Sequence, residues 1–456
     1  MQSIGTPEQL RNPNWTPPLP QAIPLGIQHI LAMFVSNVTP AIIVAGAAGF
    51  GFGSNSPDFP SLIYMIQMSM LFAGVATLLQ TIGMGPIGAR LPIVQGTSFA
   101  FVPIMVPLVA GKGVDAMAAL MCGVLVGGLI HTALAPFVGR IRFALPPLVT
   151  GLIIVMIGLY LIQVGVKYAA GGAADFQMAA PEFGGALNWS IAGLVIVVTY
   201  LLKFFTRGII SMAAVLLGLI AGYIVAVMLG MVNFGNIGRA SWFALPNPFV
   251  FGFEFSVAAI VGFGFMSLVS AVETVGDVSG IAKGGAGREA TDEEVRGATY
   301  ADGVGSAVAG IFGGLPNTSF SQNVGLVAMT GVMSRHVATI GAVFLIVCGL
   351  IPKVGAAIST VPIEVLGGGV IVMFGMVASA GVNMLSDVNW NRRNMMIFAI
   401  SLSIGLGLQM VPQAVQYLPG TMKVLMTSGL LPAAFLAIVL NLVLPKEEGE
   451  RASAMA

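Results

Sequence analysis

The sequence predicts an all-α polytopic membrane protein with fourteen transmembrane spans arranged as two inverted repeats of seven. Of the 456 residues, 57% are hydrophobic and only 8% are charged, and the mean hydropathy is +0.95. Soluble proteins carry roughly 25% charged residues, so this composition excludes a soluble protein. Apolar runs of helical length recur along the chain, which favours membrane helices over a closed barrel. In addition, two patterns of the first half recur in the second half.

Apolar runs of about twenty residues, the length that crosses a bilayer, define the predicted spans. The spans lie near 22–48, 60–83, 91–109, 116–138, 146–166, 189–206, 209–231, 256–282, 296–314, 316–331, 336–355, 362–381, 394–411 and 426–444. The first twenty residues are proline-rich and lack the pattern of a cleaved signal peptide, so we expect the first span to be retained.

The distribution of cationic residues predicts the orientation of the spans. If the N-terminus is cytoplasmic, fourteen of the nineteen Lys and Arg residues fall on that side. The exceptions are Lys112, Lys167, Arg239, Lys353 and Lys423. Positive charge accumulates in cytoplasmic loops, so we expect both tails, 1–20 and 446–456, in the cytoplasm of a bacterium whose inner membrane holds the protein. The formal net charge of +1 does not indicate a nucleic-acid partner.

Two repeated patterns predict an inverted repeat. The Gly-Thr-Ser-Phe run at 96–99 recurs as Asn-Thr-Ser-Phe at 317–320, an offset of 221 (318 − 97). The run at 151–158 recurs at 368–375, an offset of 217 (368 − 151). Both pairs lie seven spans apart, and seven is odd, so the two halves cross the membrane in opposite senses. Many secondary transporters are built on this plan.

The third and tenth spans carry residues that break a membrane helix. Pro92 and Gly96 interrupt one, and Pro316 and Asn317 interrupt the other. Irregular backbone at membrane depth is tolerated only where it is buried in protein or lines a cavity. We therefore expect a short extended segment in each span, followed by half-helices that begin near Phe101 and Asn323, with their positive N-termini facing each other. A simple proline kink would not explain the repeated Thr-Ser-Phe triplet.

Ionisable side chains inside the spans are costly, so each is a functional candidate. Glu273 lies deep in the eighth span, with Asp277 one helical turn later on the same face. Asp302 lies in the ninth span and His29 in the first. We predict that these four residues form a proton-coupling set. Structural hydrogen bonding is the alternative role for the two aspartates, and orientation of a neighbour is the alternative for the histidine.

One segment resembles the signature of a known transporter family. The run at 322–331 matches every constrained position of the nucleobase-ascorbate (nucleobase-cation symporter 2) signature, Gln/Glu/Pro-Asn-x-Gly-x-x-x-x-Thr-Arg/Lys/Gly. The runs at 28–29, 97–100 and 301–303 also resemble this family. The resemblance covers about residues 20–445, and it implies an elevator-like transporter that often works as a homodimer.

The resemblance also implies a division into two domains. The core domain would comprise 21–140 and 251–356, which hold spans 1–4 and 8–11. The gate domain would comprise 141–250 and 357–445, which hold spans 5–7 and 12–14. The homodimer would form through the gate domain.

At three positions the chain resembles the xanthine and urate branch of the family. Uracil carriers usually have Glu, His and Arg where this chain has Gln322, Asp277 and Gly331. Ser98 is small where some xanthine carriers have Asn, which leaves space for the additional oxo group of urate. The resemblance therefore implies a purine base, xanthine and/or uric acid, as the substrate.

The side chains at the site suit a purine base. Ionised Glu273 is acceptor-only and suits ring N–H donors, while the Gln322 amide offers one donor and one acceptor to a lactam edge. Phe99 supplies a ring for stacking. The rest of the predicted substrate-binding set is Ser98, Ser321 and Asn323.

These expectations amount to a proton-coupled purine importer without a cofactor or metal. Sodium remains an alternative coupling ion, because carboxylates and free carbonyls also bind it. Uracil or another nucleobase remains an alternative substrate.

An anion carrier is disfavoured by Glu273, which adds negative charge. An intramembrane enzyme is disfavoured because the three histidines and two separate cysteines form no catalytic cluster. A channel is disfavoured because the sequence has no repeated ring of filter residues.

Overall fold

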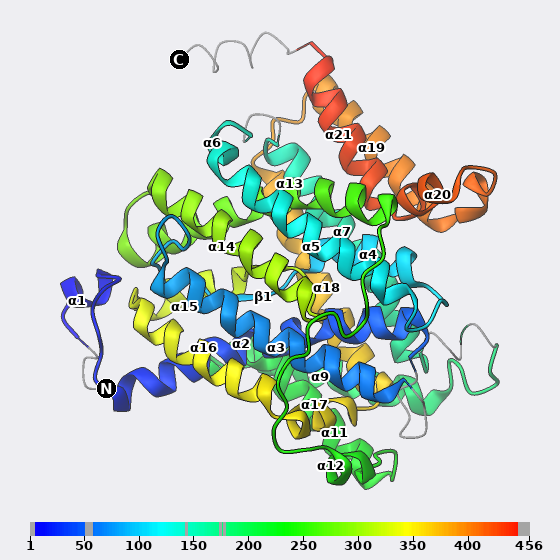
Figure 1. The fold of residues 1–456 in the computed structure, drawn as a ribbon, viewed down its shortest axis with the longest axis horizontal. Coiled ribbons are helices and arrows are strands. Elements are labelled where there is room, and N and C mark those ends of the chain that lie inside the picture. The colour runs from blue at the N-terminus through cyan, green and yellow to red at the C-terminus, as the bar shows by residue number, and fades with distance from the viewer. Residues whose placement is uncertain (1–4, 51–57, 142–144, 173–175, 177–178, 446–456) are drawn as a thin grey trace.

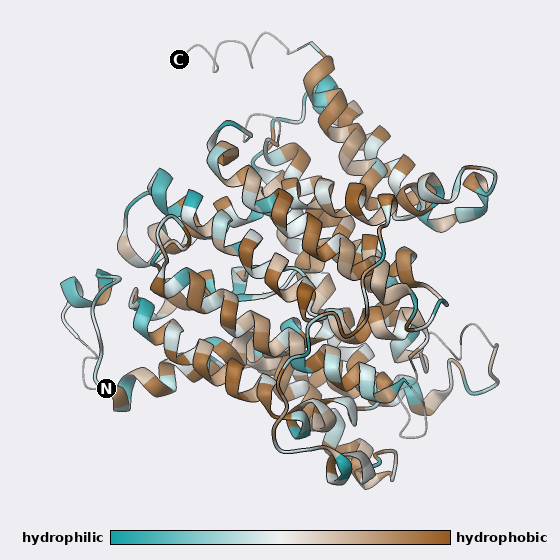
Figure 2. Ribbon diagram, viewed as in Figure 1, coloured by the Kyte–Doolittle hydropathy of each residue, from teal (hydrophilic) through white to brown (hydrophobic). Residues whose placement is uncertain are grey.

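The computed structural model describes residues 5–50, 58–141, 145–172, 176 and 179–445, and it is 74% helical (Figure 1). Seven of the described helices are long and apolar enough to cross a membrane, or up to nine if each of two bent pairs is one span. Hydrophobic residues predominate along most of these helices (Figure 2). Helices of this kind face lipid or one another, so the chain is a polytopic membrane protein, and the count of fourteen spans stays a prediction.

In its described residues, the first half of the chain contains one short strand among its helices. Its elements are α1 (Pro7–Arg11), α2 (Leu19–Ala48), α3 (Phe59–Ile82), β1 (Gln95–Thr97), η1 (Phe99–Phe101), α4 (Val102–Val109), α5 (Ala116–Leu134), η2 (Ala135–Phe137), α6 (Val138–Ile141), α7 (Pro147–Ala169), α9 (Ala186–Phe205), α10 (Ile209–Met212), α11 (Ala214–Met228) and α12 (Gly235–Arg239).

The second half also contains one strand, in the corresponding place. Its elements are α13 (Val257–Ile281), η4 (Ala282–Ala286), α14 (Asp292–Ile311), β2 (Asn317–Ser319), α15 (Ser321–Thr330), α16 (Arg335–Leu350), α17 (Pro352–Ser359), α18 (Ile363–Ser386), α19 (Arg392–Met410), η5 (Pro412–Val415), α20 (Gly420–Thr427) and α21 (Leu430–Val443).

Besides the third and tenth, two predicted spans are bent between helices. The span predicted at 336–355 comprises α16 and α17, which are bent by 81°, and the span predicted at 426–444 crosses from α20 into α21, which are bent by 80°. Pro352 lacks the N–H that would continue α16. Gly429 has a φ of 66°, a left-handed conformation that glycine adopts without strain. The apolar runs continue through both turns and do not indicate these bends.

Strands β1 and β2 pair antiparallel in the middle of the bundle. Gly96 lies opposite Thr318, and Thr97 lies opposite Asn317. The repeat offset of 221 maps Gly96 onto Asn317 and Thr97 onto Thr318, so it exchanges these two pairs. The two halves therefore meet around a local two-fold axis that passes through this strand pair. Helix α4 begins at Val102 after the η1 turn, and α15 begins at Ser321, two residues before the predicted Asn323.

The strand pair leaves no room for a side chain at Gly96. A Cβ atom there would lie 2.2 Å from Cε2 of Phe320 and 2.7 Å from Cε of Met33. Overpacking of a dense core typically costs about 1–3 kcal/mol. We expect Gly96→Ala to lower the free energy of unfolding by about this amount, measured as a lower thermal unfolding midpoint in detergent. The control is Gly407→Ala, where nothing lies within 4 Å of the added Cβ. Equal midpoints for the two variants would contradict this account of the strand crossing.

The helices pack in two groups. In one group, α5 packs against α13 and α14, and α3 packs against α14 and α16. In the other, α18 packs against α7, α9 and α11, and α19 packs against α21. The closest pair is α7 and α18, which contain the second repeated pattern. Added Cβ atoms at Gly158 and Gly381 would each lie 2.6 Å from a backbone nitrogen of the facing helix. Small residues thus bring the two repeats into backbone contact.

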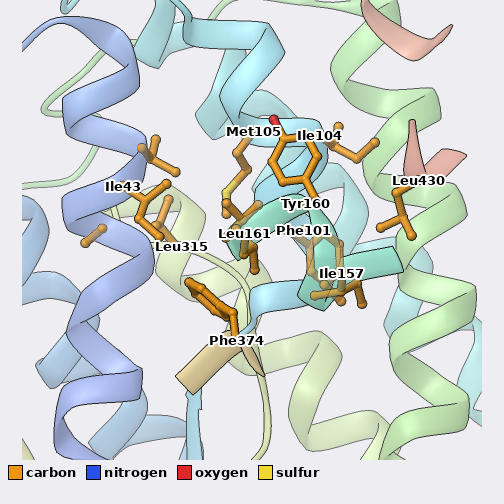
Figure 3. Close-up of a cluster of buried hydrophobic side chains, with 14 of the residues drawn as sticks. Ile43, Phe101, Ile104, Met105, Ile157, Tyr160, Leu161, Leu315, Phe374 and Leu430 are labelled. Atoms are coloured by element: carbon orange, nitrogen blue, oxygen red, sulfur yellow. The ribbon is translucent and has the colours of Figure 1, made fainter. Parts of the chain in front are cut away.

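An apolar cluster joins the two groups (Figure 3). Ile43 of α2, Phe101 and Met105 contribute from the first group, and Tyr160 of α7 and Phe374 of α18 contribute from the second. The Tyr168 hydroxyl of α7 also donates to the Ile42 carbonyl of α2, at 3.3 Å. Apolar packing thus holds the two groups together.

Candidate functional site

A cavity of about 1200 Å³ lies between the two helix groups, beside the strand pair. Five of the predicted site residues line it: Phe99, Glu273, Asp277, Ser321 and Gln322. They come from three segments of the first group of helices, namely η1, α13 and the N-terminal turn of α15, and they face Met373 of α18 in the second group. The strand pair explains this convergence, because it holds the starts of η1 and α15 next to α13.

The cavity opens toward the end of the bundle where α2 begins. Its lining continues past Pro146 at the start of α7 to Lys203 near the end of α9 and Asp387 just after α18. Lys203 and Asp387 are exposed. Among the described residues, the lining thus reaches exposed side chains at this end of the bundle.

Glu273 is the carboxylate whose oxygens are available to accept hydrogen bonds from a ligand. It lines the cavity, is half-buried, and accepts no hydrogen bond from the described residues. The Gln322 side chain is exposed to the same cavity. A ligand entering the cavity thus meets an acceptor-only group on α13 and an amide on α15, as the sequence predicted for a lactam-bearing ring.

Asp277 is held by the broken tenth span. Its two carboxylate oxygens accept from the hydroxyls of Ser319 and Ser321, each at 2.7 Å. Since Ser319 ends β2 and Ser321 begins α15, the carboxylate ties α13 to the point where strand becomes helix. Asp277 also lines the cavity, so it contributes negative charge beside Glu273.

Asp302 lies behind the cavity in a fully buried network. Its Oδ1 accepts from the amide nitrogens of Gln80, at 2.9 Å, and Gln95, at 2.5 Å. Its Oδ2 accepts from the hydroxyl of Thr274, which is also 3.0 Å from the Ser270 carbonyl. One hydroxyl hydrogen cannot serve both oxygens at once. The network therefore accommodates either protonation state of Asp302, because a protonated carboxyl can donate to Thr274 while Thr274 donates to Ser270.

His29 and Asn323 form a buried pair. Nδ1 of His29 lies 2.7 Å from Nδ2 of Asn323, which joins α2 to the first turn of α15. Both side chains are at most 2% exposed, and neither lines the cavity. His29 thus contacts neither Glu273 nor Asp302, and it orients Asn323 instead.

Ser98 and Phe99 follow β1 but differ in position. Ser98 is fully buried, its N–H donates to the Pro316 carbonyl at 2.8 Å, and its hydroxyl has no partner among the described residues. Phe99 is half-buried, lines the cavity, and meets Phe374 edge-on with ring centroids 4.9 Å apart. The Phe99 ring thereby packs against the second group of helices.

Several buried polar residues that support the site were not predicted from the sequence. Oδ1 of Asn37 accepts from the Thr97 N–H at 2.8 Å, and the Thr77 hydroxyl accepts from the Gln95 N–H at 2.9 Å. Together with Gln80 they satisfy backbone and carboxylate groups around the strand pair. The signal that could have found them is their chemistry, since amide and hydroxyl side chains inside an apolar span need partners.

In the part of the chain that the structure describes, no group of three or more His, Cys, Asp or Glu residues is placed to hold a metal ion. Asp277 and Asp302 instead accept hydrogen bonds from hydroxyls and amides, and Glu273 accepts none from the described residues.

Comparison with known sequences identifies the family. Residues 20–414 match the family model Xan_ur_permease, which is described as a permease family. The chain belongs to this family of nucleobase-ascorbate transporters. The uric acid transporter UacT of Escherichia coli is 34% identical over 91% of this chain and 84% of its own length. The xanthine permease XanP of the same organism is 34% identical over 95% of this chain and 94% of its own. The family members are permeases and not enzymes.

Solved structures of other transporters share the fold. The transmembrane domain of the cyanobacterial bicarbonate transporter BicA aligns with a TM-score of 0.56 at 15% identity, covering 93% of this chain and 97% of that one. SLC26A9 aligns with a TM-score of 0.58 at 12% identity, covering 88% of this chain and 67% of that one. At these identities the likeness concerns the fold alone.

Proposed function

We propose that this chain is a symporter that imports a purine base, xanthine and/or uric acid, together with protons. The observation that carries the proposal is the pairing of Glu273 and Gln322 across one cavity, with the Phe99 ring beside them. A purine dione offers adjacent ring N–H groups and lactam oxygens, which match an acceptor-only carboxylate and an amide. The names of the relatives UacT and XanP support the same substrate class.

The two helix groups are the proposed core and gate domains of an elevator-like transporter, with fourteen spans in all. The binding residues on α13, η1 and α15 would move with the core, while α7 and α18 would stay with the gate. If both termini are cytoplasmic, as the cationic residues predict, the open end of the cavity faces the cytoplasm. The structure would then represent an inward-facing state of a protein in the bacterial inner membrane. A homodimer formed through the gate domain would give the core a fixed support.

Protons are the proposed coupling ion, with Glu273, Asp277 and Asp302 as the groups that carry them and His29 as an orienting residue. Neutralising a carboxylate lowers the cost of moving the site, because one charge across 100 mV is worth about 2.3 kcal/mol. Sodium is the alternative coupling ion, since carboxylates bind either ion, and the uptake experiment must distinguish it from the proton.

Uptake of radiolabelled xanthine into bacterial cells that lack purine carriers tests the proposal. We expect unlabelled xanthine or uric acid to compete, and uracil not to compete. We expect a protonophore to abolish accumulation, and replacement of sodium by potassium to leave it unchanged. Competition by uracil alone, or uptake that requires sodium and survives the protonophore, would refute the proposed substrate or the proposed ion, respectively.

Gln322→Glu should weaken purine uptake. The substitution places another carboxylate in a cavity that already contains Glu273 and Asp277, and it removes the amide donor. We expect a higher KM for xanthine, with normal amounts of protein in the membrane. Gln413→Glu is the control, since it adds the same charge at an exposed position of η5 outside the cavity. An unchanged KM for Gln322→Glu would show that this side chain does not contact the substrate.

A further inference from the structure

The connection between α12 and α13 has an unusual composition for a surface loop. Residues 240–256, here called the strap, contain no helix or strand and run along the outside of the bundle (Figure 1, the long green coil). Positions 240–253 carry no charged residue and include one tryptophan and four phenylalanines. A segment exposed to water would not be expected to have this composition.

The inner edge of the strap is bonded to the helix group that contains α3, α5, α14 and α16. Its main-chain N–H groups donate to carbonyls of three of these helices, and the Tyr64 hydroxyl of the fourth accepts one more. The bonds are Ala244 N to Leu350 O at 3.0 Å, Phe249 N to Ile311 O at 2.7 Å, Glu254 N to Ala118 O at 3.2 Å, and Asn247 N to Tyr64 Oη at 3.0 Å. These contacts fix the depth of the strap relative to the helices.

The partners lie where the membrane helices end. Ile311 is the last residue of α14, Leu350 is the last residue of α16, and Ala118 is the third residue of α5. All three helix ends belong to the end of the bundle opposite the N-terminus of α2. Helices of this length end at the boundary between hydrocarbon and headgroups, so the strap lies at that level. Lys353, which follows at the start of α17, places its Nζ 4.9 Å from the ring centre of Trp242.

The outer edge of the strap is apolar and exposed. Trp242 is 75% exposed, Phe243 61%, Leu245 64% and Phe255 72%. Irregular backbone is not tolerated against lipid tails, because free N–H and C=O groups would lack partners there. Large aromatic side chains are equally unfavourable in water. The membrane interface satisfies both requirements, and aromatic residues are enriched there.

We propose that the strap is an interfacial anchor, whose aromatic side chains insert among the headgroups and glycerol esters of phospholipids in the leaflet farther from the N-terminus. The inner edge holds it to the helix ends, and the outer edge contacts lipid. This inference concerns membrane contact and holds for any transported solute.

Fluorescence of Trp242 in liposomes tests the proposal. Trp15→Phe, Trp189→Phe and Trp390→Phe leave Trp242 as the single tryptophan, and a matched variant retains Trp15 alone. Phosphatidylcholine brominated near the glycerol end of its chains should quench most of the Trp242 emission. Lipid brominated near the methyl end, and acrylamide in water, should quench it less. Trp15, in the N-terminal tail, should respond to acrylamide more than to either lipid.

A second measurement does not need the tryptophan replacements. A nitroxide attached to Phe243→Cys, in protein with Cys122→Ala and Cys348→Ala, should be more accessible to oxygen, which concentrates in the bilayer, than to a water-soluble nickel chelate. The reverse order, or quenching of Trp242 by acrylamide alone, would place the strap in water. Protection from every quencher would place it beneath another protein copy. Either result would overturn the proposal.

Discussion

Glu273→Gln is expected to abolish purine uptake while the protein remains in the membrane in normal amount. Glu273 lines the cavity and has no hydrogen-bond partner among the described residues, so its acceptors are available to a ligand. Glutamine has nearly the same shape, but it replaces one acceptor with a donor and cannot ionise. A purine N–H that meets an amide NH₂ loses its hydrogen bond and leaves a desolvated donor, which typically costs about 1–3 kcal/mol.

Uptake of radiolabelled xanthine, normalised to the membrane content of each variant, measures this effect. Glu182→Gln is the matched control, because the same substitution falls on an exposed side chain outside the cavity. We expect the Glu273 variant to show background uptake and the control to behave as the parent protein. Proton-driven accumulation at the parental level by Glu273→Gln would exclude Glu273 from both binding and coupling.

Asp302→Asn is expected to separate substrate binding from energy coupling. Asp302 is fully buried and does not line the cavity, so it cannot contact a ligand there directly. Coupling requires a group whose protonation differs between two states of the cycle, and asparagine removes such a group. We therefore expect the variant to bind purine but to equilibrate it across the membrane without accumulating it.

The hydrogen bonds around Asp302 explain why this variant should fold. An asparagine can keep its Oδ1 on the amides of Gln80 and Gln95, and its new NH₂ can donate to Thr274. Thr274 can accept this bond because its own hydrogen can turn to the Ser270 carbonyl. The groups that bond Asp302 thus each keep a partner, which avoids the penalty of leaving one of them newly unsatisfied.

Two readouts distinguish the possible roles of Asp302. A ligand that binds only the folded protein raises its unfolding midpoint, so xanthine should stabilise the purified variant as it stabilises the parent. The ratio of internal to external xanthine in intact cells should meanwhile fall to unity. Asp292→Asn, at the exposed start of the same helix, is the control. Loss of the ligand-induced thermal shift would make Asp302 a residue that shapes the pocket, and retained accumulation would make it a structural hydrogen bonder.

The inverted repeat illustrates how far pattern alone could predict this fold. The Thr-Ser-Phe triplets and their offset predicted that two broken segments correspond, and the structure pairs those segments as β1 and β2. The sequence did not predict this pairing. Backbone groups left free by Pro and Gly at membrane depth can find partners in any buried polar group, and side chains of α2 and α3 also serve β1. The bends before Pro352 and at Gly429 were missed, because the apolar runs continue through both turns.

The candidate site shows the limit of the same reasoning. Ionisable residues are so rare in the spans that Glu273, Asp277 and Asp302 could be named without any coordinates. The sequence could not predict which hydrogen-bond partners surround each of the three carboxylates. Among the described residues, Glu273 has no hydrogen-bond partner, Asp277 accepts from two serines, and Asp302 accepts from two amides and a hydroxyl. The sequence also placed Asn323 in the substrate shell, whereas the structure pairs it with His29 away from the cavity.

The sequence by itself determined that this chain is a helical membrane permease with two related halves, because composition, span length and repeated motifs are local properties of the chain. Only the tertiary structure decided which polar groups face the cavity and which face one another, and at which end the cavity opens. The physical reason is that a buried polar side chain takes whichever partner the packing of distant helices brings within reach. Gln80 and Asp302 are 222 positions apart, and His29 and Asn323 are 294 apart. No pattern within one span encodes those contacts.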